Sequence, residues 1–202
     1  AVEVLQSLPR PGFDPTVEVV MHLGIDPRQA DQAIRGAVAL PHGLGTSRKV
    51  VAFCEGEDAE KATAAGAIEV GSDELVQKIQ DGWTDFDVAI ATPAMMKTVS
   101  RLGRVLGPQG KMPSPKSGTV VPDVATAVQE FVAGKVEYRN DEGGNVQAAV
   151  GKLSFEAQQL RENIDAFLDH IRRLRPAAVK GAYIRRACVA TTMSPSIDLQ
   201  VA

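Results

Sequence analysis

The feature that most constrains this sequence is a regular alternation of short apolar runs with segments of helical pattern in its middle third. Val50 to Cys54 is a continuous apolar run, which is typical of a strand covered on both faces. Four segments follow with short connections: a helix (Asp58 to Ala65), a strand (Ala67 to Val70), a helix (Asp73 to Gln80) and a buried strand (Asp87 to Ala91). This alternation predicts a parallel, Rossmann-like sheet.

The flanking regions have other patterns. Thr16 to Leu23 alternates apolar and polar residues, which predicts a half-buried strand with Thr16 and Glu18 facing away from the core. Glu156 to Arg173 predicts an amphipathic helix, because its apolar residues recur at helical spacing. The remaining predicted elements are helices over Gln29 to Ile34, from near Pro93 and over Asp123 to Val132, strands at Ala37 to Leu40, Lys135 to Arg139, Asn145 to Val150, Tyr183 to Thr192 and Ile197 to Val201, and a hairpin turn at Asp141 to Gly144.

These patterns predict an α/β fold with two domains. A split α/β sandwich domain would comprise residues 1–42 and 135–202, and an inserted Rossmann-like domain with a parallel sheet would comprise residues 43–134. Pro41, His42 and Gly43 break the pattern at the first crossing between them, and Gly134 does so at the second. Two strand-like crossings side by side would form a two-stranded hinge. The chain opens on Ala1 inside a helical pattern, so we expect a segment before it.

Basic residues gather in one segment, although the chain has a formal net charge of −3. Lys97 to Gly118 carries five bases and no acid, and it is rich in glycine and proline. Glycine lets backbone N–H groups approach a ligand and proline stiffens the chain, which suits a polyanion. The alternative is a solvated loop whose charges only keep the protein in solution. The last 36 residues are also basic, whereas the region from Cys54 to Asp87 is strongly acidic.

An enzyme built on the Rossmann-like region, one that binds a nucleotide, is the competing hypothesis, but the phosphate-binding motifs do not fit. A P-loop needs Ser or Thr after Gly-Lys, and Met112 follows Gly110-Lys111. The dinucleotide motif must follow a strand, whereas Gly43-Leu44-Gly45 precedes one. The three histidines are scattered, so we expect no metal and no cofactor.

Cysteine use and hydropathy give a location. Cys54 and Cys188 fit no Cys-x-x-Cys motif and are expected to be buried thiols in a reducing compartment. The sequence contains no apolar run of the roughly 18 residues that a membrane span needs. We therefore expect a cytoplasmic protein without a membrane partner.

The segment from Leu102 to Val120, LGRVLGPQGKMPSPKSGTV, resembles the signature of the L-one family of ribosomal proteins, which belong to the mobile lateral stalk of the large subunit. Four further segments resemble that family in the same order, so that the likeness covers nearly the whole chain: Phe13 to Glu18, Leu23 to Gly43, Asp81 to Pro93 and Thr191 to Ser196.

The resemblance implies a function without catalysis or cofactor. The split domain would bind large-subunit ribosomal RNA (rRNA) at the lateral stalk, next to other ribosomal components. Family members assist release of deacylated tRNA from the exit site, and bacterial members repress translation of their own mRNA. The resemblance therefore implies rRNA, exit-site tRNA and the protein's own mRNA as partners of a chain that is a monomer when free.

The resemblance also implies the contact residues. The main rRNA surface would comprise Phe13, Thr16, Glu18, Thr192, Met193, Ser194 and Pro195. A carboxylate such as Glu18 is tolerable there only if it accepts from a base amino group or a ribose 2′-OH. The alternative is that Phe13 caps the core and Glu18 is merely solvated. Charge and neighbourhood add phosphate contacts at Arg139, Lys152, Lys180, Arg185 and Arg186, and tRNA or RNA contacts of the inserted domain at Arg101, Arg104, Lys111 and Lys116.

At three positions, each within or next to these predicted contacts, the chain differs from the family pattern. Family members usually have a basic residue where this chain has Gly12, a small polar residue where it has Arg186, and glycine where it has Ser194. Gly12 removes one expected phosphate contact, and Ser194 would alter a turn that faces RNA.

Overall fold

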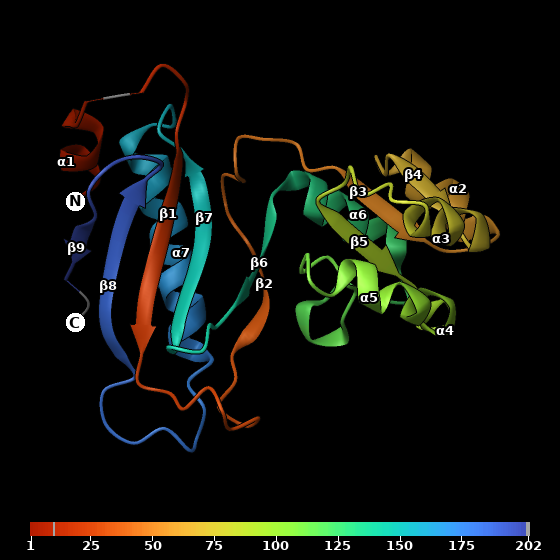
Figure 1. Cartoon of the computed structure of the whole chain (residues 1–202). Coiled ribbons are helices and arrows are strands. Elements are labelled where there is room, and N and C mark those ends of the chain that lie inside the picture. Colours follow the sequence, from red (N-terminus) through yellow and green to blue (C-terminus); the bar gives the residue numbers. More distant parts are fainter. Residues whose placement is uncertain (10, 201–202) are drawn as a thin grey trace. The chain divides into compact units, whose positions relative to one another are not determined.

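The computed structural model describes residues 1–9 and 11–200 and has an α/β fold, as predicted (Figure 1). The chain divides into two compact units. Unit 1 consists of Ala1–Thr46 with Val136–Ala202, and unit 2 consists of Ser47–Lys135. Unit 1 is thus built from both ends of the sequence, and unit 2 is continuous.

A four-stranded antiparallel sheet forms the centre of unit 1. Its strand order is β7 (Asn145–Lys152), β1 (Thr16–Leu23), β8 (Ile184–Thr191) and β9 (Ile197–Leu199). Val17, Val19, Met21 and Leu23 of β1 are buried, whereas the residues between them are exposed or half-buried. The alternation predicted from Thr16 onward is therefore confirmed.

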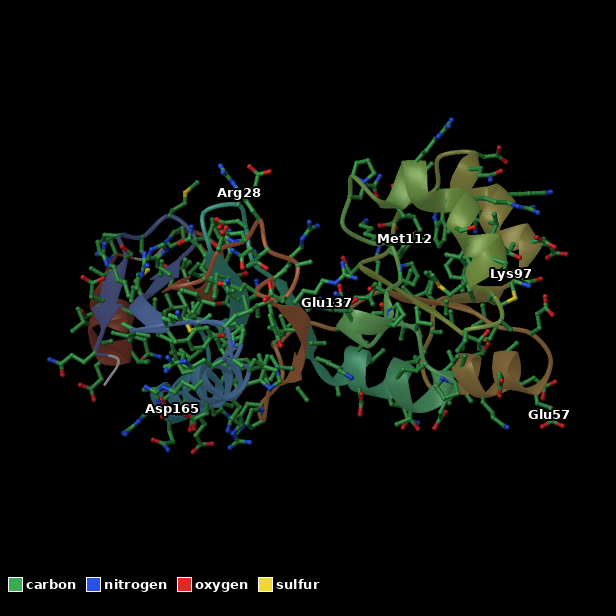
Figure 2. All side chains as sticks on the ribbon, turned by 90° about the horizontal axis from the view of Figure 1, so that it is seen from below. Arg28, Glu57, Lys97, Met112, Glu137 and Asp165 are labelled. Atoms are coloured by element: carbon green, nitrogen blue, oxygen red, sulfur yellow. The ribbon has the colours of Figure 1, made fainter. Side chains whose placement is uncertain are left out.

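Helix α7 (Ala157–Arg173) covers one face of this sheet (Figure 2). It begins with a capping box, in which Glu156 and Gln159 satisfy each other's backbone N–H groups. Five apolar residues on one side of the helix point into the core: Leu160, Ile164, Phe167, Leu168 and Ile171. Asp165 lies on the outer side of the helix (Figure 2). Helix α1 (Val2–Ser7) adds Leu5 to the same core. In the described residues the opposite sheet face has no helix packed on it (Figure 1).

A second, two-stranded sheet in unit 1 pairs β2 (Arg35–Ala39) with β6 (Lys135–Arg139). The predicted hairpin at Asp141 to Gly144 is wrong as a strand pair, because β6 pairs with β2 and β7 pairs with β1. Across the turn we find a single bridge, Asn140 to Val146, in the described chain. The turn itself is present and is held by Asp141, whose carboxylate accepts from the backbone N–H groups of Gly143 and Asn145.

The helix predicted over Gln29 to Ile34 is also wrong. The segment forms turns, in which side chains compete with helical backbone bonds. Asp26 accepts from the backbone N–H of Arg28 at 3.1 Å, and Gln32 accepts from the backbone N–H of Asp26 at 2.9 Å. Asp26-Pro27, a pair that often begins a helix, therefore begins a turn here.

The first crossing out of unit 1 is fastened to α7. Asn163 is fully buried, accepts from the backbone N–H of His42 and donates to the backbone carbonyls of Gly43 and Val150. His42 Nε2 also lies 2.5 Å from the Glu162 carboxylate, and this contact holds the pKa of Glu162 below its usual value. Pro41 precedes this anchor, and at the other crossing Gly134 ends helix α6 (Val124–Ala133) with φ 116°. That these residues act as a hinge stays a prediction.

Unit 2 contains the predicted parallel sheet, with strand order β4 (Glu69–Gly71), β3 (Val50–Phe53) and β5 (Val88–Ala91). Both of its faces are covered (Figure 2). Helices α2 (Glu57–Ala64) and α6 (Val124–Ala133) pack on one side, and α3 (Asp73–Gln80) and α4 (Met96–Val99) pack on the other. Every residue of β3 and β5 is buried, as their continuous apolar sequences predict.

The basic segment from Lys97 to Gly118 is a loop only in its second half. Helix α4 leads directly into the 3₁₀ turn η1 (Ser100–Leu102) and helix α5 (Gly103–Leu106). Val99, Leu102 and Leu106 recur at helical spacing and are buried, so that packing forces this half to be helical. Another 3₁₀ turn, η2 (Pro115–Ser117), follows in the looped half.

Candidate nucleic-acid interface

The candidate site is the face of the four-stranded sheet that α7 does not cover, here called the outer sheet face. Residues that pair across antiparallel strands point to the same side. The pairing places Glu18 between Ala149 and Ala190, Val20 between Gln147 and Cys188, and His22 between Asn145 and Arg186. Thr16 pairs with Lys152 at one end of the face.

Glu18 lies in the flattest part of the outer sheet face. Its neighbours Ala149 and Ala190 are small, so that no tall side chain from β7 or β8 stands beside its carboxylate. Glu18 is exposed and has no hydrogen bond or ion pair among residues 1–9 and 11–200. Both of its oxygens can therefore accept hydrogen bonds from a ligand that lies flat on the sheet.

Thr16, Lys152 and Thr192 meet at one end of this face. Lys152 Nζ donates to Thr16 Oγ1 at 2.9 Å, and the backbone N–H of Thr192 donates to the carbonyl of Thr16 at 3.1 Å. Two predicted rRNA contacts and one predicted phosphate contact are thus side by side. A cation beside two hydroxyl groups suits the sugar–phosphate backbone of a nucleic acid.

The turn between β8 and β9 presents Met193. Ser194 N–H donates to Thr191 O at 3.0 Å, and Met193, at the third position of the turn, has φ 69°. That position usually carries glycine or asparagine. The Ser194 hydroxyl accepts from Thr191 N–H and donates to Pro195 O. Ser194 therefore holds the turn, and the Met193 side chain is 87% exposed.

Phe13 lies just before β1 and is 51% exposed. The alternative that Phe13 caps the core is therefore wrong. The segment is fixed by its neighbour Asp14, whose carboxylate accepts from both the backbone N–H and the hydroxyl of Ser154. An exposed aromatic ring on an ordered segment can stack on a base or a ribose.

The other predicted phosphate contacts of unit 1 differ in their surroundings. Arg186 lies on the outer sheet face and is paired with Asp198, with Nε–Oδ1 at 2.9 Å and Nη2–Oδ2 at 3.0 Å. Lys180 is exposed in the connection between α7 and β8, and Arg185 is exposed on β8. Arg139 lies on β6, in the two-stranded sheet, and is not on the outer sheet face.

The cations of unit 2 are divided in a similar way. Arg101, Arg104 and Lys116 are exposed, as is Lys97 (Figure 2). Lys111, by contrast, donates to the backbone carbonyl of Thr84 at 3.0 Å and lies 5.2 Å from the centre of the Phe86 ring. Lys111 thus links the basic segment to the core of unit 2, against which the next residue, Met112, also packs (Met112 is labelled in Figure 2).

Comparison with known proteins decides the family. Residues 5–195 match the model of the Ribosomal protein L1p/L10e family. The chain belongs to this family. The chain is 53% identical over 199 residues to the large ribosomal subunit protein uL1 of Kosmotoga olearia, covering 98% of this chain and 86% of the relative. It is 54% identical to uL1 of Lactobacillus gasseri over the same shares, and 52% identical to uL1 of Clavibacter michiganensis over 100% of this chain and 88% of the relative.

In this member of the L1p/L10e family, a nucleotide phosphate in unit 2 would have to bind at the N-terminus of helix α2, which is unsuitable for it. Helix α2 follows β3, and its first turn carries Glu57, Asp58 and Glu60. The partial positive charge of a helix N-terminus attracts phosphate, and three carboxylates there repel it. Residues 1–9 and 11–200 contain no cluster of three potential metal ligands. Among the same residues, no helix is long and apolar enough to cross a membrane.

Sequence reasoning missed several residues of the outer sheet face. His22 was not among the predicted contacts, although it continues the alternation from Thr16. Gln147, Asn145 and Ala190 could be found only from the strand register, which joins residues more than 120 positions apart. Cys188 was expected to be buried, yet it is half-exposed on this face, whereas Cys54 is buried and burial raises the pKa of its thiol.

Proposed function

We propose that this protein is a structural constituent of the large ribosomal subunit in the cytoplasm, and that it binds rRNA of the lateral stalk through the outer sheet face. Family membership supports the ribosomal role. The observation that carries the choice of surface is the uncovered face itself, which presents Glu18 among small residues and Thr16, Lys152 and Thr192 at one end.

The chemistry of this face favours folded RNA over a generic polyanion. Glu18 would repel phosphate, so a ligand must bring a donor such as a base amino group or a 2′-OH to its carboxylate. Lys152 and the exposed Lys180 supply cations for the backbone. Phe13 and Met193 supply exposed apolar side chains that can pack against a base or a ribose.

We also propose the finer roles that the family resemblance implies. In unit 2, the exposed Arg101, Arg104 and Lys116 would contact exit-site tRNA during its release. The outer sheet face would bind a look-alike structure in the protein's own mRNA and so repress its translation. Lys111 is removed from this set of contacts, because it holds the fold of unit 2.

The test is direct binding of the purified protein to a lateral-stalk rRNA fragment from Clavibacter michiganensis, over a range of salt concentrations. We expect specific binding that weakens as salt rises, because Lys152 and its basic neighbours neutralise phosphates. A scrambled hairpin of equal length is the control. Equal affinity for both RNAs would overturn the proposal.

A thermal-shift screen with ATP and NAD tests the competing hypothesis of a nucleotide-binding enzyme. Stabilisation of the protein by either nucleotide would support that hypothesis.

A further inference from the structure

A hollow of about 350 Å³ lies on the outer sheet face, and Arg186 is the one residue of its lining that was among the predicted rRNA contacts. It is lined by Val20, His22, Asn145, Arg186, Cys188 and Ser196. Ligand-binding pockets start at about 300 Å³, so the hollow has room for one nucleoside. Its lining from Val20 and Cys188 is apolar, and the remaining residues are polar.

On the polar side of the hollow, the hydrogen bonds of Asn145 determine which atoms of Asn145 and His22 donate and which accept. A carboxylate only accepts, so Asn145 Nδ2 must donate to Asp141 Oδ2 at 2.9 Å. This turns Asn145 Oδ1 toward His22 Nδ1, 2.9 Å away, so that Nδ1 carries the hydrogen. In neutral His22, Nε2 is then an acceptor with no partner among the described residues.

Arg186 supplies the donors. Its Nε and Nη2 are engaged by Asp198, which leaves the Nη1 hydrogens without a partner in the part of the chain that the structure describes. The carboxylate also offsets the charge of Arg186. The hollow therefore combines one acceptor and one oriented donor on a site that is close to neutral, beside an apolar lining.

We infer that this hollow binds a single unstacked nucleoside of the RNA, with the flat base or ribose against Val20 and Cys188 and with its polar edge on His22 and Arg186. A phosphate is a poorer occupant, because Asp198 would face it. This inference rests on the proposed rRNA binding. It extends the RNA contact along β1 from Glu18 to His22 and adds readout of one extruded nucleotide to the recognition of RNA shape.

Filling the hollow tests the inference. Val20 and Cys188 point away from the core, so that Cys188→Phe occupies the hollow without reaching α7. We expect Cys188→Phe to weaken binding to the stalk fragment by about tenfold, the loss typical of one stacked base. Gln158→Phe, which adds the same ring on exposed α7, is the matched control and should bind as the wild type does.

A panel of stalk fragments, each with one abasic nucleotide, identifies the occupant. One abasic position should weaken wild-type binding by about tenfold and cause no further loss in Cys188→Phe, because both changes remove the same contact. His22→Ala keeps the hollow open and should show the same coupling if Cys188→Phe fails to fold. Wild-type affinity of Cys188→Phe and His22→Ala, or additive penalties at every position, would overturn the inference. Failure of the wild type to bind the fragment would instead overturn the proposed function.

Discussion

The two sheets of this protein differ in how many of their faces are covered. In unit 2, helices lie on both sides of the parallel sheet, and every residue of β3 and β5 is buried. In unit 1, α7 covers one side only, and β1 alternates buried Val17 and Val19 with the exposed Glu18. An uncovered sheet face for a large ligand therefore exists in unit 1, whereas unit 2 exposes mainly helices and loops.

The two units also differ in where their charged residues lie. The most basic segment of the chain lies in unit 2, yet its helical half is held by buried Leu102 and Leu106, and Lys111 is engaged with Thr84. The outer sheet face of unit 1 has an acid, Glu18, at its centre. Counting cations along the sequence thus identifies a different region from the uncovered sheet face.

Separating the two units is the strongest test of the claim that unit 1 binds stalk RNA and unit 2 does not. A chain that joins residue 46 to residue 136 through a short Gly-Ser linker should keep stalk-RNA affinity, because the outer sheet face is complete in unit 1. Residues 47–135 alone should not bind the stalk fragment. Gel-shift titration measures both, and circular dichroism melting tests whether each unit folds alone, as the two-domain prediction requires. Stalk binding by residues 47–135 would contradict the comparison.

Alkaline pH should destabilise unit 1 through its two tyrosines. Both tyrosines of the chain are in unit 1, and burial raises the pKa of Tyr138 and of Tyr183 to about 12. The unfolded chain ionises its tyrosines near pH 10, so stability is full below pH 10 and is lost as pH rises toward 12, by on the order of 2 kcal/mol per tyrosine. Absorbance at tyrosine wavelengths follows unit 1, and fluorescence of the single Trp83 follows unit 2.

Tyr183→Phe is the control for that experiment. The Tyr183 hydroxyl is buried and has no hydrogen-bond partner among the described residues, so its removal should cost little at neutral pH. It should remove the Tyr183 share of the alkaline destabilisation. Simultaneous loss of the Trp83 signal and the tyrosine signal would show that the two units do not unfold separately.

Changing the carboxylate at the centre of the outer sheet face sharpens the comparison further. Glu18→Ala should lower stalk-RNA affinity by about 10- to 100-fold, the range expected for losing hydrogen bonds to a charged acceptor. Glu18→Gln keeps one acceptor oxygen and should lose less. Since Glu18 is exposed, the melting temperature should stay constant in both variants. Tighter binding by Glu18→Ala would mean that the carboxylate only repels RNA.

Two lysines of unit 2 allow a matched test of structural and surface cations. Lys111→Ala should lower the free energy of unfolding of unit 2 by about 1 kcal/mol, because it removes a hydrogen bond to Thr84 and a contact with the Phe86 ring. Lys116→Ala should leave stability unchanged, since Lys116 is exposed. Neither should change stalk-RNA affinity. Urea titration followed by Trp83 fluorescence measures stability, and equal effects of the two substitutions would refute the distinction.

Adding a cation beside the outer sheet face should have the smallest effect. Gly12 is exposed and has open space where a side chain would begin. Gly12→Lys should strengthen stalk-RNA binding a few-fold at low salt and steepen the slope of log affinity against log salt by about one. Gln109→Lys, an equal charge added in unit 2, should leave both quantities unchanged. An identical slope change in the two variants would assign the effect to net charge alone.

Local sequence patterns predicted much of the fold. The alternation of β1 and the spacing of apolar residues in α7 needed only a few neighbours to be recognised, and both were confirmed. The predicted hairpin at Asp141 to Gly144 was wrong because β6 and β7 have distant partners. The facing of Thr16 and Glu18 was likewise local and correct, but the small neighbours Ala149 and Ala190 depend on strand register, which the sequence does not encode locally.

The rRNA contact that we propose for Met193 has a cost to the stability of the fold. Its left-handed backbone conformation costs roughly 1 kcal/mol or more relative to glycine, and its exposed side chain returns nothing to the free fold. Selection for heat tolerance alone should therefore replace methionine by glycine at this position, and the same replacement would remove the apolar side chain that we propose packs against rRNA.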